Sequence, residues 1–299
     1  MKIAILHQDL EIPEKNLLKV FRQKGHQAEL FDVRITKPDV LQNCDVVLNR
    51  VYASVGNRNW QDNVVTLNLL EQMEKKGVKC INSFMTSKVD YSKAYAAQIM
   101  KTAGVKTPET IKLTSYHDLP EAVDFATKKG FPVILKRDLG GRSKDLFMLH
   151  DRAELLEKMQ FVFAEHYRRD YDAGFVLQEF VKPVKEYDCR IAIVNGEFAF
   201  AFARTLARTK HDGMAWLASV ARGSQSMEYN PSHEEIELAK KATEAIGAIW
   251  NEVDITFSEN GPVIIENNPT PNFVSYAEER IKKAADLVLQ QSCIVEVEK

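Results

Sequence analysis

The chain has 299 residues, of which 45% are hydrophobic and 27% are charged, as in an ordinary globular protein. Its 40 basic and 42 acidic residues give a net charge of -2, so no overall positive field recruits nucleic acid or an acidic membrane. The cysteines (Cys44, Cys80, Cys189 and Cys293) form no CxxC pair, and no apolar run suits a signal peptide or a membrane span. A cytoplasmic protein with reduced thiols is expected.

Short apolar runs alternate with helical stretches over the first 86 residues. The runs "KIAILH", "QAELFDV", "DVVLNRV" and "VKCIN" are typical of strands, and helices are expected over 13–25 and 61–76. This alternation predicts a parallel sheet covered by helices, whose ligands bind beyond the carboxyl ends of the strands. The loop after the third strand carries Arg50, Arg58 and Trp60, either as exposed loop residues or as ligand contacts.

The middle of the chain predicts a small α+β unit. A helix over 87–103 is followed by "VKTPETIKL", another helix and the strand "FPVILK" at 131–136. The polar turn "RDLGGRSKD" leads to the strand "LFMLH", a helix over 151–169 and the strand "FVLQEFV" at 175–181.

The last third predicts antiparallel structure. "DCRIAIV" and "EFAFAFART" flank Asn195-Gly196, a strong hairpin signal, and "EVDITF-SENG-PVIIEN" is a second hairpin. Between them lie a polar segment, 206–230, and a helix that starts at Pro231 and Ser232. A C-terminal helix is expected from about Ser275. The parallel and antiparallel parts are expected to face each other across a cleft.

The turn of the second hairpin decides which residues meet across it. A two-residue loop at 260–261 would put Asp254 opposite Asn267. A three-residue loop at 259–261 would put Asp254 directly opposite Glu266 and would bury the "VII" run sensibly. Opposed carboxylates repel each other, so the second register requires a cation.

Asp254, Glu266 and Asn268 then form a cluster of oxygen ligands. Glu266 and Asn268 are two residues apart on one strand and therefore share a face. Magnesium prefers such ligands and is held by one or two carboxylates together with substrate phosphates. The alternative is structural: the carboxylate caps a backbone turn, and Asn268 shapes the turn at the following prolines.

Basic and glycine residues near the middle hairpin suggest phosphate contacts. Lys136 ends an otherwise buried strand, where a lysine either extends to the surface or meets a phosphate. The turn that follows contains Gly140 and Gly141, and either covers phosphates or is a plain surface turn. Asp188 and Arg190 share a face two residues apart, as a structural ion pair or as part of a site.

The order of these motifs resembles the ATP-grasp carboxylate–amine ligases, and most closely the RimK-type glutamate ligases and their glutathione-synthetase-like relatives. The resemblance is good over about 87–299 and loose before that. It implies a mixed α/β and α+β ATP-grasp fold. An N-terminal parallel α/β domain (1–86) would precede the ATP-grasp domain (87–299), which comprises a central lid subdomain (about 106–182) and a C-terminal antiparallel, metal-binding subdomain (183–299).

The resemblance also implies roles for individual residues. ATP contacts are expected from Lys93, Lys136, Gly140, Gly141, Glu179, Phe180, Val181 and Asp188, the last near the ribose. Asp254, Glu266 and Asn268 would hold two magnesium ions, with Mn²⁺ as a substitute, and Arg190 and Arg204 would lie near the transferred phosphoryl group. Arg50, Arg58 and Arg222 are candidate substrate contacts.

The implied reaction joins a small-molecule or peptide carboxylate to an amine through an acyl phosphate and releases ADP and phosphate. The sequence names neither substrate and leaves a homo-oligomer open. Two departures from the family pattern stand out. Ser143 and Asp145 replace glycines in the loop, and Leu217 and Ser219 stand where a basic residue and an asparagine are usual, with Arg208 or Lys210 as substitutes. These departures leave one alternative open, an ATP-binding sensor or scaffold without turnover, against which the intact set of Asp254, Glu266 and Asn268 argues.

Overall fold

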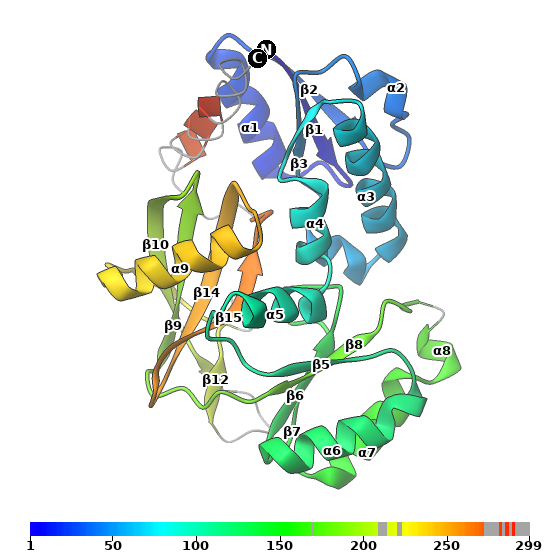
Figure 1. The fold of residues 1–299 in the computed structure, drawn as a ribbon, viewed down its shortest axis with the longest axis vertical. Helices are drawn as coiled ribbons and strands as arrows, with labels where there is room; N and C mark the ends of the chain where they lie inside the picture. Colours follow the sequence, from blue (N-terminus) through cyan, green and yellow to red (C-terminus); the bar gives the residue numbers. More distant parts are fainter. Residues whose placement is uncertain are drawn as a thin grey trace.

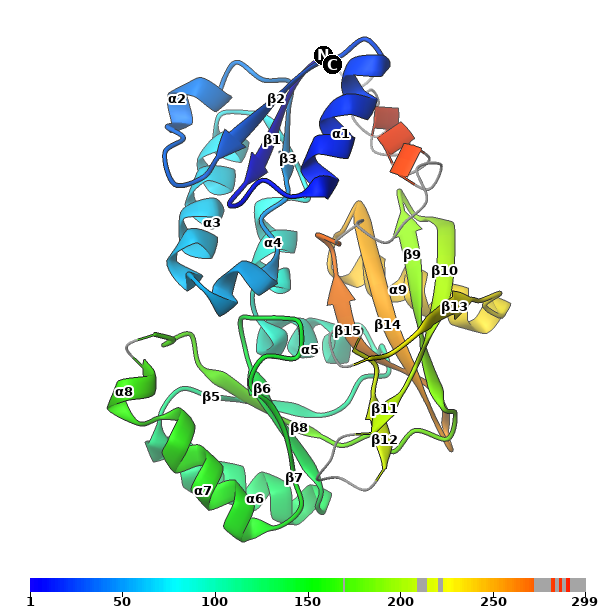
Figure 2. The same ribbon diagram turned by 180° about the vertical axis from the view of Figure 1, so that it is seen from behind.

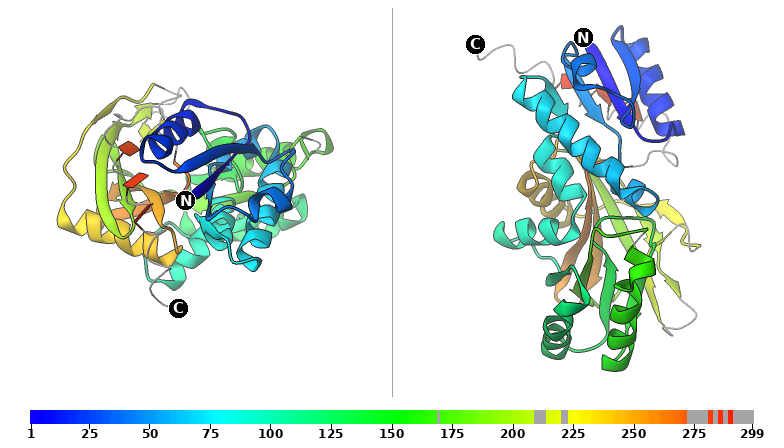
Figure 3. Two further views of the ribbon diagram at one scale, coloured as in Figure 1. Left: turned by 90° about the horizontal axis from the view of Figure 1, so that it is seen from above. Right: turned by 90° about the vertical axis from the view of Figure 1, so that its right-hand side faces the viewer.

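The computed structural model describes residues 1–168, 170–208, 214–219 and 223–271, with short helical pieces at 281–282, 285–286 and 289–290. The N-terminal domain and the lid subdomain lie at opposite ends of the long axis, with the C-terminal sheet beside them (Figures 1 and 3). In the described part of the chain, no helix is long and apolar enough to cross a bilayer.

The N-terminal domain is the predicted parallel sheet. Its strands β1 (Lys2–His7), β2 (Gln27–Asp32), β3 (Val46–Asn49) and β4 (Lys79–Ile81) are parallel and lie in the order β2-β1-β3-β4. The connections contain α1 (Ile12–Gln23), α2 (Pro38–Leu41), the 3-10 helix η1 (Ala53–Asn57) and α3 (Trp60–Lys75). Apolar side chains of α1 and α3, such as Leu17 and Leu70, are fully buried against the sheet.

Two helices, and not the single predicted one, follow the N-terminal domain. Helix α4 (Phe84–Asp90) ends before Ser92, and α5 (Lys93–Thr102) begins directly after it. Ser92 starts the new helix because its side chain accepts a hydrogen bond from Tyr95 N at 3.2 Å, and Asp138 Oδ1 accepts one from Ala94 N at 2.8 Å. The break puts Lys93 in the first turn of α5, beside the strands of the other subdomains.

The lid subdomain is an antiparallel sheet in the order β5-β8-β6-β7, covered on its outer face by α6 and α7 (Figure 1). Its elements are β5 (Thr110–Leu113), η2 (Tyr116–Asp118), α6 (Leu119–Lys129), β6 (Val133–Arg137), β7 (Leu146–Leu149), α7 (Arg152–Val162), α8 (Glu165–Arg168) and β8 (Phe175–Glu179). The single helix predicted over 151–169 is wrong. The helix ends at Val162, where the Phe163 ring packs edge-on against Phe175 with ring centroids 5.7 Å apart.

The C-terminal subdomain is an antiparallel sheet in the order β13-β10-β9-β14-β15, with helix α9 on one face. Its elements are β9 (Tyr187–Val194), β10 (Glu197–Thr205), β11 (Ala207–Arg208), β12 (Ala215–Leu217), β13 (Ser226–Glu228), α9 (His233–Ala245), β14 (Trp250–Ser258) and β15 (Gly261–Asn268). Asn195 and Gly196 form the predicted tight turn, with positive φ angles of 56° and 74°. The helix predicted from about Ser275 starts outside the described residues.

The second hairpin places Asp254 opposite Glu266, as expected, but by a different turn. Ser258 pairs with Gly261, so the loop is the two-residue turn 259–260. A bulge of one extra residue in β15 then shifts the register and brings Asp254 across from Glu266. The predicted three-residue loop is therefore wrong, whereas the pairing that it was meant to explain is right.

Candidate active site

One cavity of about 650 Å³ lies where the N-terminal domain, α5, the lid and the C-terminal sheet meet. Its walls include Tyr52 and Ser54 from the N-terminal domain and Trp216 from β12. The residues predicted to contact nucleotide, metal or the phosphoryl group all line it: Lys93, Lys136, Gly140, Gly141, Glu179, Phe180, Val181, Asp188, Arg190, Arg204, Asp254, Glu266 and Asn268. Residues separated by up to 175 positions thus share one space.

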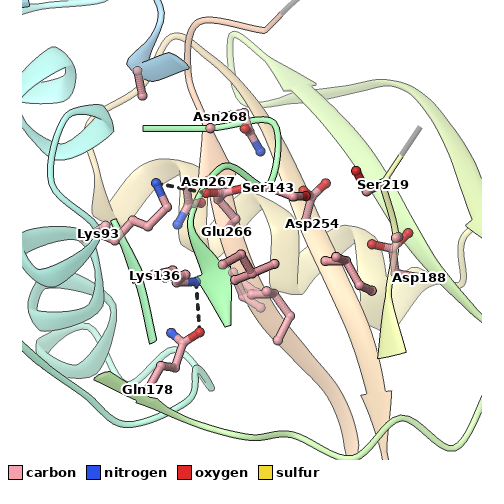
Figure 4. A pocket seen from close by; sticks show the side chains of 18 of the residues that line it. Lys93, Lys136, Ser143, Gln178, Asp188, Ser219, Asp254, Glu266, Asn267 and Asn268 are labelled. Carbon is pink, nitrogen blue, oxygen red and sulfur yellow. Dashed lines mark hydrogen bonds and ion pairs between the residues drawn. The ribbon is translucent and has the colours of Figure 1, made fainter. Parts of the chain in front are cut away.

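Lys93 and Lys136 lie on one side of the cavity and Glu266 faces them (Figure 4). The Lys93 ammonium donates a hydrogen bond to Gly140 O at 2.8 Å and lies 3.3 Å from Glu266 Oε1. Lys136 donates to Gln178 Oε1 at 2.9 Å, and Gln178 in turn donates from Nε2 to Thr110 Oγ1 at 2.9 Å. Both ammonium groups are thus held at the cavity by short polar contacts.

Lys136 is buried, and burial lowers the pKa of its ammonium to about 8, against the opposing effect of the Glu266 carboxylate. A lysine in this environment is charged below that pH and neutral above it. A polyphosphate bound beside it would favour the charged form, so binding above pH 8 requires proton uptake.

We therefore expect ATP affinity to decrease about tenfold per pH unit as the pH rises above about 8. Lys136→Met should bind ATP more weakly at pH 7 and should lose this pH dependence. Isothermal titration calorimetry at pH 7, 8 and 9 would measure both proteins. Parallel pH profiles for the two proteins would show that Lys136 does not meet the phosphates.

Alternating charges cross three strands of the C-terminal sheet. Arg204 on β10 donates two hydrogen bonds to Asp188 on β9, of 3.0 and 2.6 Å. Arg190 on β9 grips Asp254 on β14 with two more, of 2.6 and 2.7 Å, and Arg204 Nη2 lies 3.1 Å from Asp254 Oδ1. The strand register places Arg204 directly opposite Asp188 and Arg190 directly opposite Asp254, so the sheet itself builds the network.

The cation that the opposed carboxylates require is therefore present within the protein itself. Burial alone would raise the pKa of Asp254, but Arg190 and Arg204 outweigh it and lower that pKa to about 2. Glu266 is balanced by Lys93. Burial raises the pKa of Asp188 to about 6, an effect that Arg204 offsets only in part. Repulsion between Asp254 and Glu266 is thus no proof of a metal.

The donor set nevertheless fits magnesium. Asp254 Oδ1 accepts from two arginines and Oδ2 from one, which leaves Oδ2 a lone pair for a further partner. Asn268 donates its Nδ2 to Glu252 O at 3.1 Å, so its oxygen is the end that can bind a metal. The described residues contain no cluster of three His, Cys, Asp or Glu suited to a metal. Magnesium held partly by phosphates needs fewer protein ligands than that.

The cavity also contains the strand exit at Glu179, Phe180 and Val181. Glu179 N donates to Glu109 O at 2.9 Å, which ends the β5–β8 pairing. The Phe180 ring meets Trp216 edge-on with centroids 6.2 Å apart. Trp216 lies in the polar segment 206–230, and its aromatic ring was the only sequence signal for this contact.

The backbone conformation of the loop between β6 and β7 explains why the family usually has glycines there. Arg142, Ser143 and Asp145 have φ angles of 56°, 55° and 51°, a region that favours glycine. Asp145 is held there because its Oδ2 accepts hydrogen bonds from Arg137 Nε at 2.7 Å and from Tyr167 at 2.5 Å. Side-chain contacts thus stabilise a backbone shape that glycine would adopt without them.

Two of the three candidate substrate arginines lie away from the cavity walls. Arg50 is buried, lies 3.4 Å from Glu14 and donates to Pro271 O at 2.6 Å, so it joins the N-terminal domain to the chain after β15. Arg58 pairs with Asp9 at 3.1 Å on the surface of the N-terminal domain. Arg222 lies outside the described residues, as does Lys210.

The atypical residues Leu217 and Ser219 both line the cavity. Ser219 is buried and its backbone N donates to Ser224 Oγ at 2.8 Å, a local turn contact. The basic side chain expected in this segment is thus replaced by the apolar Leu217.

Asp138 and Asn57 were missed by sequence reasoning although they position the site. Asp138 is buried, accepts from the start of α5 and lies 2.9 Å from Lys112 Nζ. An aspartate directly after a predicted buried strand is a sequence signal for a residue of the site. Asn57 contacts the β6–β7 loop from 84 residues away, and no local pattern indicates such a contact.

Solved structures with the same fold are ATP-grasp enzymes. D-alanine–D-alanine ligase from Bacillus anthracis superposes with a TM-score of 0.72 and 17% identity over 100% of this chain and 99% of its own. A RimK domain ATP-grasp protein from Sphaerobacter thermophilus gives a TM-score of 0.70 and 16% identity over 97% and 98% of the two chains. The fold is therefore the predicted ATP-grasp fold.

The sequence identifies the family within this fold. Residues 91–290 match the model of the RimK-like ATP-grasp domain, so the chain belongs to the RimK-like ATP-grasp family. Among curated relatives, a probable alpha-L-glutamate ligase from Cellvibrio japonicus is 25% identical over 97% of this chain and 94% of its own length. Another, from Aeromonas salmonicida, is 24% identical over 91% and 89% of the two chains.

Proposed function

We propose that this protein is an ATP-dependent carboxylate–amine ligase that forms an amide or peptide bond and releases ADP and phosphate. The observation that carries this is the cavity itself, where Lys93 and Lys136 face Asp254 and Glu266. Phosphoryl transfer depends on positioning and charge neutralisation, which lysines, arginines and metal-binding carboxylates supply without a nucleophile–base pair.

The proposed roles follow the walls of the cavity. The hinge at Glu179–Val181, with Phe180 and Trp216, would hold adenine, and Asp188 would approach the ribose. Lys93, Lys136 and the backbone of Gly140 and Gly141 would bind the phosphates. We assign the domains accordingly: 1–86, a lid at about 106–182 and a C-terminal part at 183–299, each with its own sheet.

Asp254, Glu266 and Asn268 would hold magnesium, as two ions, with Mn²⁺ as a substitute. When bound, the metal supplies neutralisation of the phosphate charge that develops during transfer. A neighbour of the same fold, the Bacillus anthracis ligase, has been solved with ATP, which supports the nucleotide assignment.

Arg190 and Arg204 have a positioning role in the first instance, since they fix Asp254 and Asp188. In the proposed reaction the substrate carboxylate oxygen attacks the γ-phosphorus of ATP and ADP leaves. The amine then attacks the acyl carbon, phosphate leaves, and the nitrogen loses a proton. Both arginines line the cavity, where their positive charge would stabilise the negative charge that moves between these groups.

The amine is proposed to be an amino acid or a peptide, because several curated relatives are named as probable alpha-L-glutamate ligases. The acid is a small molecule or a peptide, and one structural neighbour has been solved with a peptide precursor. We propose a cytoplasmic location, with no membrane or nucleic-acid partner; homo-oligomer formation is open.

The nucleotide products test this proposal. We expect ADP and phosphate when the protein is incubated with Mg-ATP and pools of amino acids, dipeptides, metabolite acids and amines. Chromatography of the nucleotides measures the outcome. AMP and pyrophosphate as main products would exclude the acyl-phosphate route.

The alternative is an ATP-binding sensor or scaffold of the same fold. Leu217 and Ser219 favour it, because a residue that would contact the acyl phosphate is apolar here. Tight Mg-ATP binding without ADP release across all pools would support this alternative.

A further inference from the structure

The β6–β7 loop, residues 138–145, is docked onto the N-terminal domain. Asn57 at the end of η1 holds Gly141 with two hydrogen bonds: its Nδ2 donates to Gly141 O at 2.7 Å, and Gly141 N donates to its Oδ1 at 3.3 Å. Lys144 Nζ donates to Asn57 O at 2.9 Å. The Asn57 side chain therefore hydrogen-bonds both the backbone N–H and the backbone C=O of Gly141.

The surfaces around Asn57 fit closely. Leu139 is buried, and a Cβ added to Gly56 would come within 2.7 Å of Leu139 Cγ. A Cβ added to Gly141 would lie 3.0 Å from Ser54 Cβ. A Cβ at Gly56 would therefore displace the Leu139 side chain, and a Cβ at Gly141 would be tight against Ser54, so the loop and η1 are closely packed. Figure 2 shows the loop rising from β6 toward the N-terminal domain.

The docked loop is connected directly to the candidate site. Gly140, next to Gly141, accepts a hydrogen bond from Lys93 Nζ, and the same ammonium lies 3.3 Å from Glu266 Oε1. A continuous series of contacts thus runs from Asn57 through the loop and Lys93 to Glu266. If the loop moved away from η1 as a rigid unit, Lys93 would lose its hydrogen bond to Gly140 O.

We propose that Asn57 is a positioning residue that latches the 138–145 loop over the reacting phosphates. The proposal rests on the ligase function proposed above for its consequence, and on the contacts alone for the latch. An acyl phosphate is lost to water unless the site is closed. A ligase with a weakened latch should therefore still transfer the phosphoryl group to the substrate acid. It should use more ATP per amide formed, because water would hydrolyse the acyl phosphate to the free acid and phosphate before the amine reacts.

The latch itself can be tested without turnover. Asn57→Ala removes both hydrogen bonds to Gly141, and we expect the Gly141 amide to exchange with deuterium roughly tenfold faster or more. Asn59→Ala is the matched control, since the Asn59 side chain does not cap helix α3 and the same atoms are removed two residues away. An unchanged exchange rate in Asn57→Ala would overturn the latch.

The consequence is tested by the ratio of ADP released to amide formed, with any substrate pair that the pooled screen identifies. We expect this ratio to be near one in the wild type and in Asn59→Ala, and to rise several-fold in Asn57→Ala. Gly56→Ala, which obstructs Leu139 from the opposite side, should raise it as well. An unchanged ratio in both variants, despite faster Gly141 exchange, would refute the shielding role. Faster Gly141 exchange in Asn57→Ala, combined with a wild type that forms no amide, would instead refute the ligase function and leave the latch in place.

Discussion

Replacing Glu266 by Gln is expected to lower turnover by about two to three orders of magnitude. The substitution keeps the shape of the side chain but removes one negative charge from the group proposed to hold magnesium at the phosphates. Glu266 faces Lys93 across the cavity, so the charge is lost where phosphoryl transfer is proposed to occur. ADP release in the presence of Mg-ATP and pooled substrates measures the effect.

The same variant should fold normally. The Glu266 side chain is 32% exposed and its contact with Lys93 is 3.3 Å, so the contact contributes less than about 1 kcal/mol to stability. Denaturant unfolding should therefore place the variant within that range of the wild type. Retained turnover would show that Glu266 only caps the turn before the prolines.

Asp254→Asn is expected to be destabilising where Glu266→Gln is not. The Asp254 side chain is only 8% exposed. It accepts hydrogen bonds from Arg190 and forms an ion pair with Arg204. Its neutralisation leaves two largely buried guanidinium groups with one carboxylate fewer between them, Asp188 and Glu252 remaining, at a cost of about 2–4 kcal/mol. Glu266→Gln is the matched control, because it is the same carboxylate-to-amide change at the paired position on the next strand.

The pH dependence gives this prediction a second test. Arg190 and Arg204 lower the pKa of Asp254 to about 2, below its ordinary value of about 4. The ionised carboxylate thus stabilises the fold above about pH 4, and this contribution is lost as the pH falls toward 2. The stability difference between the wild type and Asp254→Asn should shrink over that interval. A stability difference independent of pH would mean that the ionised Asp254 carboxylate does not stabilise the fold through Arg190 and Arg204.

Much of the fold was predictable because its signals are local. Alternating apolar runs and helices gave the parallel sheet, the Asn195-Gly196 pair gave a hairpin, and the ordered motifs gave the ATP-grasp fold and the RimK-like family, which the match over residues 91–290 confirms. The cavity also contains the residues predicted to contact nucleotide and metal.

The features that sequence reasoning missed depend on contacts between distant segments. The break before α5 is stabilised by Asp138, 44 residues from Ala94. The role of Arg50 is fixed by Pro271, 221 residues away. The register of β14 and β15 came from a bulge that no turn residue signals. Such contacts form only when separate elements pack together, so a local pattern does not reveal them.

Magnesium-dependent nucleotide binding tests the central claim most directly. Calorimetric titration with ATP, in Mg²⁺ and then in EDTA, should be run on the wild type and on Glu266→Gln. We expect Mg²⁺ to tighten ATP binding to the wild type at least tenfold, and to have a much smaller effect on the variant. Equal Mg²⁺ dependence in the two proteins, or no ATP binding by the wild type, would contradict the assignment of this cavity as a Mg-ATP site.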